Sequence, residues 1–429
     1  MSAVNKKYIL IAILIFFSVS SAFGAQITFS PRLTLSEEYT DNVFRVPDIP
    51  ELGLEPEEDF IFRVAPGATL GFVGRKADLS IAYDPYYSDY KNNEYLSRWS
   101  HVANLAGNWQ MTKNTRSFLT DSFIYAEDPQ EEDAITGRSG RNPYYRNTSV
   151  IGLTHQFGER DFITLQYTHR EFREDTEFGI PPDDSTTYSP ELTLDYWFTS
   201  RWGVGTQLAY TNGQFEITEN FENTYAEVRL LYNYSRRWDF FIAHAQTYQD
   251  FMEDSEDYQI YYQSLGFDYN YDATTFLSLE GGPLVRDYND SSEEYGFTVF
   301  ADGRKIWLFQ RGNIDINVRN GLDYDYASTQ NLGLFYYTSA GGTANYNFYR
   351  NFSANITGSY RYNAYVDLEP VRYDNIYRAG TGLQWLMTSN CSLQLNYNSI
   401  ERQSNDAYAL EEYAENRVYL GISYFPRNP

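Results

Sequence analysis

The sequence predicts an all-β protein: a closed, antiparallel, up-and-down transmembrane β-barrel of about twenty strands. Three observations support this prediction. An export signal precedes the folded part, apolar and polar residues then alternate in short runs, and tight turns alternate with long acidic connections. Two-faced strands that pair through short turns at one end and longer loops at the other are typical of bacterial transmembrane barrels.

The first 24 residues have the features of a secretory signal peptide. Lys6 and Lys7 precede an apolar run over residues 8–19, and the small residues Ala22 and Gly24 stand at positions −3 and −1 of a cut before Ala25. The apolar run is shorter than the roughly 20 residues that a membrane-spanning helix needs. We therefore expect residues 1–24 to be removed and residues 25–429 to form the barrel.

After residue 25, apolar side chains recur at every second position, which is the period of a β-strand. Clear examples are Phe60/Phe62/Val64, Ile163/Leu165/Tyr167 and Val418/Leu420/Ile422. Tight turns are expected near residues 75, 113, 159, 200, 236, 273, 307, 350 and 389. Nine turns join eighteen strands, and one more strand at each end makes twenty, an even number as in single-chain bacterial barrels. The turn near residue 307 is the least clearly marked, so 18–20 strands stay open.

The connections between these hairpins are longer and acidic. They cover residues 40–58, 127–133, 171–184 and 250–257. Several tight turns are instead basic, among them Arg75-Lys76, Arg236-Arg237 and Arg304-Lys305. Because bacterial barrels have short turns on the periplasmic side, we expect the basic turns there and the acidic loops outside. The rival fold is a soluble propeller or tandem sandwich. The aromatic residues at the strand ends favour a barrel, since they resemble the girdles at membrane interfaces.

Composition limits the chemistry that the chain can perform. It has 58 acidic residues against 33 Lys and Arg, a formal net charge of −25, which disfavours a nucleic-acid partner. The single cysteine, Cys391, excludes an internal disulfide framework and a Cys-rich zinc site. No nucleophile elbow, P-loop or dinucleotide motif occurs, so we expect no enzyme, no cofactor and no metal site. The most tempting catalytic cluster, His169 with Arg170 and Glu171, matches no nucleophile motif.

If the apolar face meets lipid, the alternate positions line the interior. Charged residues at those positions are Arg63, Asp78, Arg170, Glu191, Asp195, Glu227, Arg229, Asp268, Glu280, Asp315, Arg319, Arg361, Arg378 and Arg417. Seven acids and seven arginines predict a balanced lumen, with the negative charge mainly in the outer loops. The other interior positions are mostly hydroxyl, amide and glycine residues. Such a lining suits a hydrated polyhydroxyl cargo, although polar lumens are general in porins.

Two N-terminal segments carry a family resemblance. Residues 30–44 (SPRLTLSEEYTDNVF) and residues 59–67 (DFIFRVAPG) are similar to the start of the outer-membrane proteins called putative β-barrel porin 2. The strong likeness covers about the first 70 residues of the mature chain, and the rest agrees in pattern and length. The resemblance implies an outer-membrane conduit for secreted polysaccharide, associated with exopolysaccharide export, with a periplasmic export protein as partner. It supplies no catalytic residues.

The expected surroundings are outer-membrane lipids and lipopolysaccharide, with a hydrophilic polymer as cargo. Three other functions stay open. The first is a general diffusion porin, which an inward-folded loop with opposed charges would favour. The second is a structural or surface-binding protein, which a lumen filled by side chains would favour. The third is an outer-membrane hydrolase, which needs a histidine paired with Asp and Ser at the rim.

The signal peptide gives a direct test. We expect the protein isolated from the outer membrane to begin at Ala25, because the small residues before it fit the cleavage site. N-terminal sequencing or intact mass measurement checks this, and a mature chain that still begins at Met1 contradicts it.

Overall fold

The computed structural model describes residues 26–127, 142–174, 184–252, 256–289, 293–325, 333–366, 371–405 and 412–426. Its strands are β1 (Gln26–Thr40), β2 (Asp59–Val73), β3 (Ala77–Tyr83), β4 (Tyr86–Tyr90), β5 (Arg98–Gln110), β6 (Thr115–Ala126), β7 (Tyr144–Gln156), β8 (Phe162–Glu174), β9 (Ser185–Tyr196), β10 (Trp202–Phe215), β11 (Phe221–Ser235), β12 (Trp238–Phe251), β13 (Tyr258–Asp272), β14 (Thr275–Tyr288), β15 (Glu294–Phe309), β16 (Gly312–Asp325), β17 (Gly333–Tyr349), β18 (Phe352–Tyr365), β19 (Arg372–Thr388), β20 (Cys391–Ser404) and β21 (Tyr413–Tyr424). Two short 3₁₀ turns, η1 (Pro50–Leu52) and η2 (Glu94–Leu96), lie in loops. None of the helical segments in these ranges is long and apolar enough to cross a membrane.

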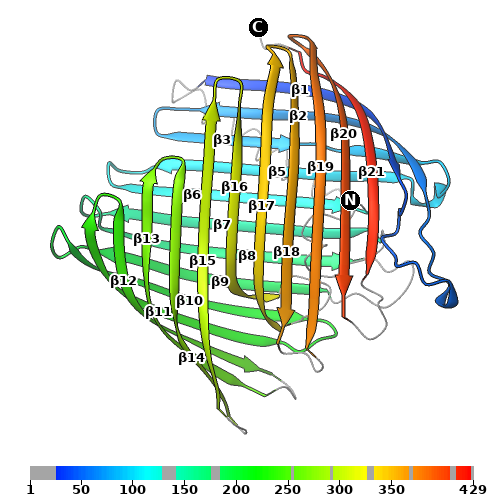
Figure 1. Ribbon diagram of the computed structural model, residues 1–429. Coiled ribbons are helices and arrows are strands. Elements are labelled where there is room, and N and C mark those ends of the chain that lie inside the picture. The colour runs from blue at the N-terminus through cyan, green and yellow to red at the C-terminus, as the bar shows by residue number, and fades with distance from the viewer. Residues whose placement is uncertain are drawn as a thin grey trace, which may run out of the picture.

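The strands form one antiparallel sheet that closes on itself (Figure 1). Each strand pairs with its neighbours in sequence, except that β3 and β4 both pair with β2 and β5 and not with each other. The first strand, β1, pairs with β2 on one side and with the last strand, β21, on the other. The closing ladder runs from Leu33↔Tyr424 to Thr40↔Arg417. The predicted closed up-and-down barrel is therefore confirmed.

Strands β3 and β4 are two halves of one barrel strand. Both pair with β2 in the same register, at Ala68↔Tyr83 and Val64↔Tyr87, so no residue is inserted between them. The ladder is interrupted at Asp84-Pro85, because proline has no N–H to donate. Counting the two halves as one, the described residues form twenty barrel strands, the upper value of the expected range.

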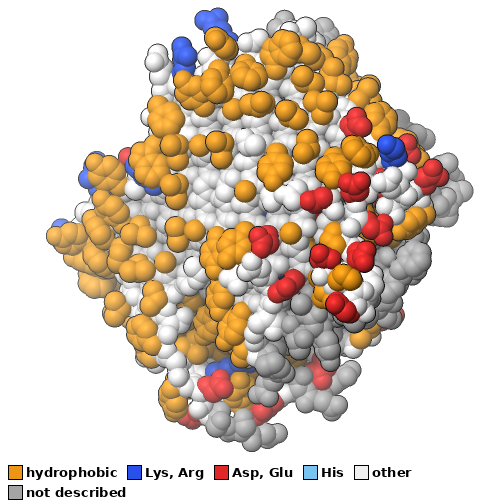
Figure 2. Space-filling view, turned by 45° about the vertical axis from the view of Figure 1, so that its right-hand side comes forward, with side chains coloured by type: hydrophobic (Ala, Val, Ile, Leu, Met, Phe, Trp, Pro, Cys, Tyr) orange, Lys and Arg blue, Asp and Glu red, His pale blue; other side chains and the backbone are white. Residues whose placement is uncertain are grey.

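The two faces of the sheet differ as the alternation predicts. Large apolar side chains such as Leu265, Ile242 and Leu165 are 56–71% exposed on the outer face. At the tight-turn end, aromatic residues form an exposed girdle that includes Trp109, Tyr196, Trp202, Trp307, Phe348 and Trp385. Figure 2 shows acidic side chains gathered on one side of the molecule, Lys and Arg on the opposite side, and apolar side chains over the surface between.

The nine expected tight turns are present, with one correction. The turn predicted near residue 307 lies at Gln310-Arg311, between β15 and β16. Arg304-Lys305, predicted as a basic turn, lie within β15 and pair across to β14 and β16. The prediction was wrong because Trp307 and Phe309 form an aromatic pair like those beside the other turns, three residues too early.

The long connections lie at the opposite end of the barrel from the tight turns. The first, residues 41–58, is described completely. Those predicted at 127–133, 171–184 and 250–257 lie partly outside the described residues, and the signal peptide lies wholly outside them. Inside the described ranges, β8 extends to Glu174 and β12 to Phe251, so these strands are longer than the loop prediction implied.

A matched pair of substitutions tests which face meets lipid. Leu165, on the outer face of β8, is 56% exposed, and Gln166 follows it on the inner face. We expect Leu165→Arg to lower the free energy of unfolding from lipid vesicles by about 2–4 kcal/mol, the cost of Arg near the bilayer midplane. Gln166→Arg is expected to cost less than about 1 kcal/mol, because its side chain stays in water. Guanidinium titrations of both variants measure this, and equal costs contradict the assigned faces.

Candidate functional site: the inner face of the barrel

All fourteen charged residues predicted to face the interior alternate with the exposed apolar residues of their strands. Cross-strand registers keep them on one face: Arg63 pairs opposite Ser36 on β1, Glu227 opposite Gln207 on β10, and Arg378 opposite Ser359 on β18. In a closed barrel this is the inner face. That these residues line a path for solute stays a prediction.

The inner charges are segregated around the ring. On the wall formed by β9–β14, the described inner positions hold six acids, Glu191, Asp195, Glu227, Asp239, Asp268 and Glu280, against Arg229 and Arg286. On the wall formed by β19–β21, β1 and β2, together with Arg45 of the first loop, the described residues hold seven arginines, Arg32, Arg45, Arg63, Arg372, Arg378, Arg402 and Arg417, against Glu38, Asp59, Asp374 and Glu415. We call these the acidic wall and the basic wall. In the ring of twenty strands, β11 and β21 lie ten strands apart, so the two walls face each other.

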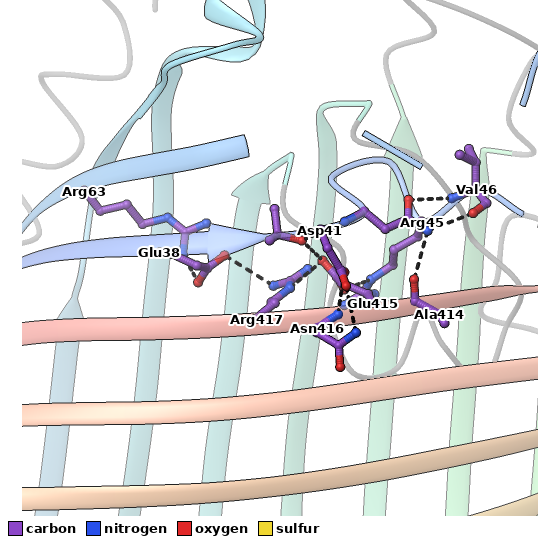
Figure 3. Close-up of polar contacts among 11 residues, drawn as sticks. Glu38, Asp41, Arg45, Val46, Arg63, Ala414, Glu415, Asn416 and Arg417 are labelled. Atoms are coloured by element: carbon purple, nitrogen blue, oxygen red, sulfur yellow. Dashed lines mark hydrogen bonds and ion pairs between the residues drawn. The ribbon is translucent and has the colours of Figure 1, made fainter. Parts of the chain in front are cut away.

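An ion-pair chain crosses the seam where the barrel closes (Figure 3). The Arg63 guanidinium on β2 lies 3.3 Å from the Glu38 carboxylate on β1, whose other oxygen lies 3.7 Å from Arg417 on β21. Arg417 Nε donates to Glu415 at 2.6 Å. Thr40 Oγ1 on β1 also donates to Glu415, at 2.8 Å. Separating such ion pairs would leave buried charges without partners, which is costly. The ion pairs therefore hold β2, β1 and β21 together.

The same chain anchors the first loop to the last strand. Arg45, in the loop at residues 41–58, donates from Nε to Glu415 at 2.8 Å, and both side chains are almost fully buried. The Asn42 side-chain amide donates to the Ala414 and Val46 carbonyls, at 3.0 and 2.8 Å, and its side-chain oxygen accepts from the Val46 N–H. These bonds hold Arg45 at a φ of 52°, a left-handed conformation that is uncommon for a residue other than glycine. The start of the loop is therefore fixed against the basic wall.

A second buried ion cluster lies beside the seam. Asp374 on β19 accepts two hydrogen bonds from Arg372, both at 3.1 Å, and a third from Arg402 on β20 at 2.6 Å. The side chains of Asp374 and Arg402 have no exposure to solvent. Two arginines share one carboxylate, so the cluster adds to the positive charge of the basic wall.

The acidic wall has its own network. Arg229 on β11 contacts Glu227 at 2.5 Å and Glu280 of β14 at 3.5 Å. Tyr225 donates to Glu227 at 2.6 Å, and Ser264 donates to Glu280. One arginine is shared by two carboxylates here, which is the reverse of the arrangement around Asp374.

The long-loop end of the β16–β17 hairpin leans into the barrel. β14 pairs with β15 as far as Arg286↔Glu294, but β15 pairs with β16 only from Ala301↔Asn320 onward. Beyond that point Leu334 of β17 packs in one buried cluster with Ile260 and Tyr262 of β13. Three strands separate β13 from β17 along the wall, so this contact requires the hairpin end to fold inward. Figure 1 shows β16 swinging away from β15 at this end.

An uncharged polar surface covers the inner face of β17–β20 toward the tight turns. We call it the amide track; its residues are Thr343, Asn345, Ser353, Asn355, Thr357, Ser359, Gln384, Gln394, Asn396 and Asn398, with glycines 341, 380 and 382. A Cβ at Gly382 would lie 2.2 Å from the Asn355 side-chain oxygen and 2.5 Å from that of Asn396. The glycine thus leaves room for both amides to lie against the wall. The amide track therefore presents many uncharged hydrogen-bond donors and acceptors.

The one tempting catalytic cluster is not assembled. His169 and Glu171 lie on the outer face of β8, whereas Arg170 lies on the inner face. The His169 ring packs 5.2 Å from the Tyr188 ring, and Glu171 accepts from Tyr145 and pairs with Arg173. Within the described ranges, no group of three His, Cys, Asp or Glu side chains has the arrangement of a metal site.

Some interior residues were missed by the sequence analysis. Four of them lie on the inner face near strand ends: Glu38, Asp374, Arg402 and Glu415. They continue the same alternation as the predicted inner residues of their own or adjacent strands, so extending the alternation to the strand ends would have found them. Arg45 had no such signal. It lies in a loop, and its partner Glu415 is 370 residues away in the sequence.

Comparison with known proteins agrees with this architecture. Residues 279–424, which run from β14 to β21, match the model of the family described as putative beta-barrel porin 2. The chain is a bacterial outer-membrane β-barrel that resembles this family. The match includes the basic wall from β19 to β21 and the amide track. It does not include residues 30–44 and 59–67, which carry the resemblance described from the sequence, so the match lies in the C-terminal part of the chain.

Several solved outer-membrane proteins are similar over 93–94% of this chain. They include the copper transporter OprC (10% identity, 80% of that chain, TM-score 0.50), OpdK from Pseudomonas aeruginosa (11%, 98%, 0.37) and the siderophore receptor PirA from Acinetobacter baumannii (8%, 81%, 0.47). At these identities the likeness concerns the fold alone. No curated relative matches the chain.

The loop anchor generates a prediction. Glu415→Gln removes the charge that pairs with Arg45, which is buried, and with Arg417, which is partly buried. We expect stability to fall by about 3–5 kcal/mol, as for breaking a buried ion pair, and the single-channel current to become larger and noisier as the first loop moves.

Glu401→Gln is the matched control, because Glu401 lies one strand away on the outer face and contacts only Gln403 among the residues described. Guanidinium unfolding and planar-bilayer recordings measure the two effects. A Glu415→Gln channel as quiet as the control would show that the ion pair does not hold the loop.

Proposed function

We propose that this outer-membrane barrel is a passive conduit for a large hydrophilic polymer, a secreted polysaccharide, delivered by a periplasmic export protein. The amide track carries the proposal. It crosses four strands with hydroxyl, amide and glycine residues, and among the described inner positions between the tight turns and Arg378 it holds no charge. A chain of sugars can exchange hydrogen bonds along such a wall without a strong binding step. No chemistry in the barrel is needed.

The width of the barrel supports a large cargo. Barrels of about 16–18 strands already leave an aqueous channel, and this ring has twenty. The first loop and the inward β16–β17 end occupy part of that width, both on the long-loop side. The amide track lies on the tight-turn side, so a polymer entering from the periplasm would meet the neutral surface first.

A diffusion porin for small solutes is the second candidate, and a specific observation favours it. Two elements lean inward at the same end of the barrel, and the interior carries an acidic wall opposite a basic wall. Opposed charges beside a narrowed section would orient small polar solutes and limit the size that passes. The two candidates differ in what the narrowed section admits, which is measurable.

The amide track supplies a prediction that separates them. Gly382→Leu should push Asn355 and Asn396 off the wall, because its Cβ would overlap both side-chain oxygens. In planar bilayers, we expect the residence time of a neutral oligosaccharide such as maltohexaose to fall about two- to tenfold, the equivalent of one lost hydrogen bond of about 0.5–1.5 kcal/mol.

Gly358→Leu is the control, because Gly358 lies on the outer face of β18 and a Cβ there meets only a carbonyl oxygen at 3.9 Å. If maltohexaose blocks neither variant nor the wild type while current flows, the small-solute porin is favoured. If polysaccharide secretion continues unchanged in cells without this protein, the conduit is excluded.

A further inference from the structure

The inner face has a hollow whose described lining residues include more arginines than acids, although the whole protein is acidic. It has a volume of about 490 Å³ and is lined by residues of β16–β21 and of the first loop. Its lining includes small or uncharged residues at the end of the amide track, such as Gly341, Thr357 and Ser359. It also includes Arg45, Arg378 and Arg417, with Glu415 as the one acid among the described lining residues. The volume is within the usual range for a small-molecule site.

The charges around the hollow favour an anion. Glu415 is engaged by Arg45 at 2.8 Å and by Arg417 at 2.6 Å, so two arginines share the one carboxylate among the described lining residues. Arg417 also lies 3.7 Å from Glu38, which Arg63 contacts as well. Its Nη2 makes no hydrogen bond to any described residue although it is buried. The described lining of the hollow therefore holds three arginines against one carboxylate, which favours an anion.

Neutral donors and acceptors beside the arginines define the rest of the ligand. Asn317, Thr343, Thr357 and Asn398 line the same hollow. Hydroxyl and amide groups suit the hydroxyls of a sugar, whereas guanidinium groups suit a carboxylate, to which they bond in a planar, charge-assisted manner. A ligand that carries both groups on one ring would use both sets.

We propose that the hollow is a binding site for an acidic sugar unit, a sugar ring bearing a carboxylate, so that the cargo is an anionic polysaccharide. The substrate class rests on the proposed function, whereas the site stands on the hollow and its arginines alone. The acidic wall across the barrel repels the same ligand and would keep it on the basic wall. An otherwise strongly acidic protein thus offers the polymer a local positive surface beside a neutral track.

The test is binding to the refolded full-length mature barrel in a zwitterionic detergent, measured by isothermal titration calorimetry. The probes are trigalacturonate and, as its uncharged counterpart, maltotriose. We expect trigalacturonate to bind at least tenfold more tightly, and the difference to shrink as salt is raised because the charges are then screened.

Three variants locate the site. Arg378→Gln should weaken trigalacturonate binding about tenfold, and Ser359→Leu should weaken it by filling the hollow without changing charge. Arg170→Gln is the matched control, because it removes one inner-face arginine from β8, outside the hollow, and should leave binding unchanged. Circular dichroism checks that each variant is folded.

Each outcome decides the proposal. Equal affinity for the two probes in the wild type overturns it, and so does an equal loss in Arg378→Gln and Arg170→Gln, which would indicate a general field rather than a site. Planar-bilayer currents are recorded on the same preparations. Binding without current would keep the site and exclude the conduit, whereas current without a preference for trigalacturonate would keep the conduit and exclude the site.

Discussion

The constraint on which the rest of the structure depends is that a backbone crossing a bilayer must satisfy its own hydrogen bonds. Lipid offers no partners, so a sheet in the membrane has to close. Here the closure is the pairing of β1 with β21 from Leu33 to Thr40. The same residues of β1 that complete the ladder also present Glu38 and Thr40 to the inner side, where they meet Arg417 and Glu415. Pairing of β1 with β21 therefore closes the sheet and also brings together the charged groups of the basic wall at this seam.

Charge is arranged at two scales in this molecule. The chain as a whole is acidic, and exposed acids lie along the first loop, at Glu51, Glu55 and Glu57 for example. Inside, acids and arginines separate onto facing walls, each tied by shared ion pairs: two arginines on Asp374 on one side, and two carboxylates on Arg229 on the other. The neutral amide track lies on β17–β20, partly on the same strands as the basic wall, and leads toward the hollow. The separation of charge follows from strand order, because neighbouring strands carry like charges and closure of the ring places the two walls opposite each other.

Sequence reasoning was most reliable where the geometry is local. The period of two predicts which face a strand residue occupies, and the fourteen interior charges all follow it, because the alternation depends only on the pleat. It was weaker at turns, because Trp307 and Phe309 form an aromatic pair like those that flank the other turns but lie within β15. It could not find Arg45 or the inward lean of the β16–β17 end. Both depend on contacts between residues far apart in the chain, such as Leu334 with Ile260, which no local pattern encodes.

The bond between Arg45 and Glu415 joins the beginning of the chain to its end, and this has a consequence for assembly. The loop and the strand that anchors it are 370 residues apart in the sequence, so the anchor can form only when β1 and β21 have come together. Without β21 the barrel would keep most of its strands, but the first loop would have no anchor. The hollow would also lack two of the residues that line it, Glu415 and Arg417. The anchor of the first loop and the closure of the sheet are therefore completed together, and a barrel without β21 has neither.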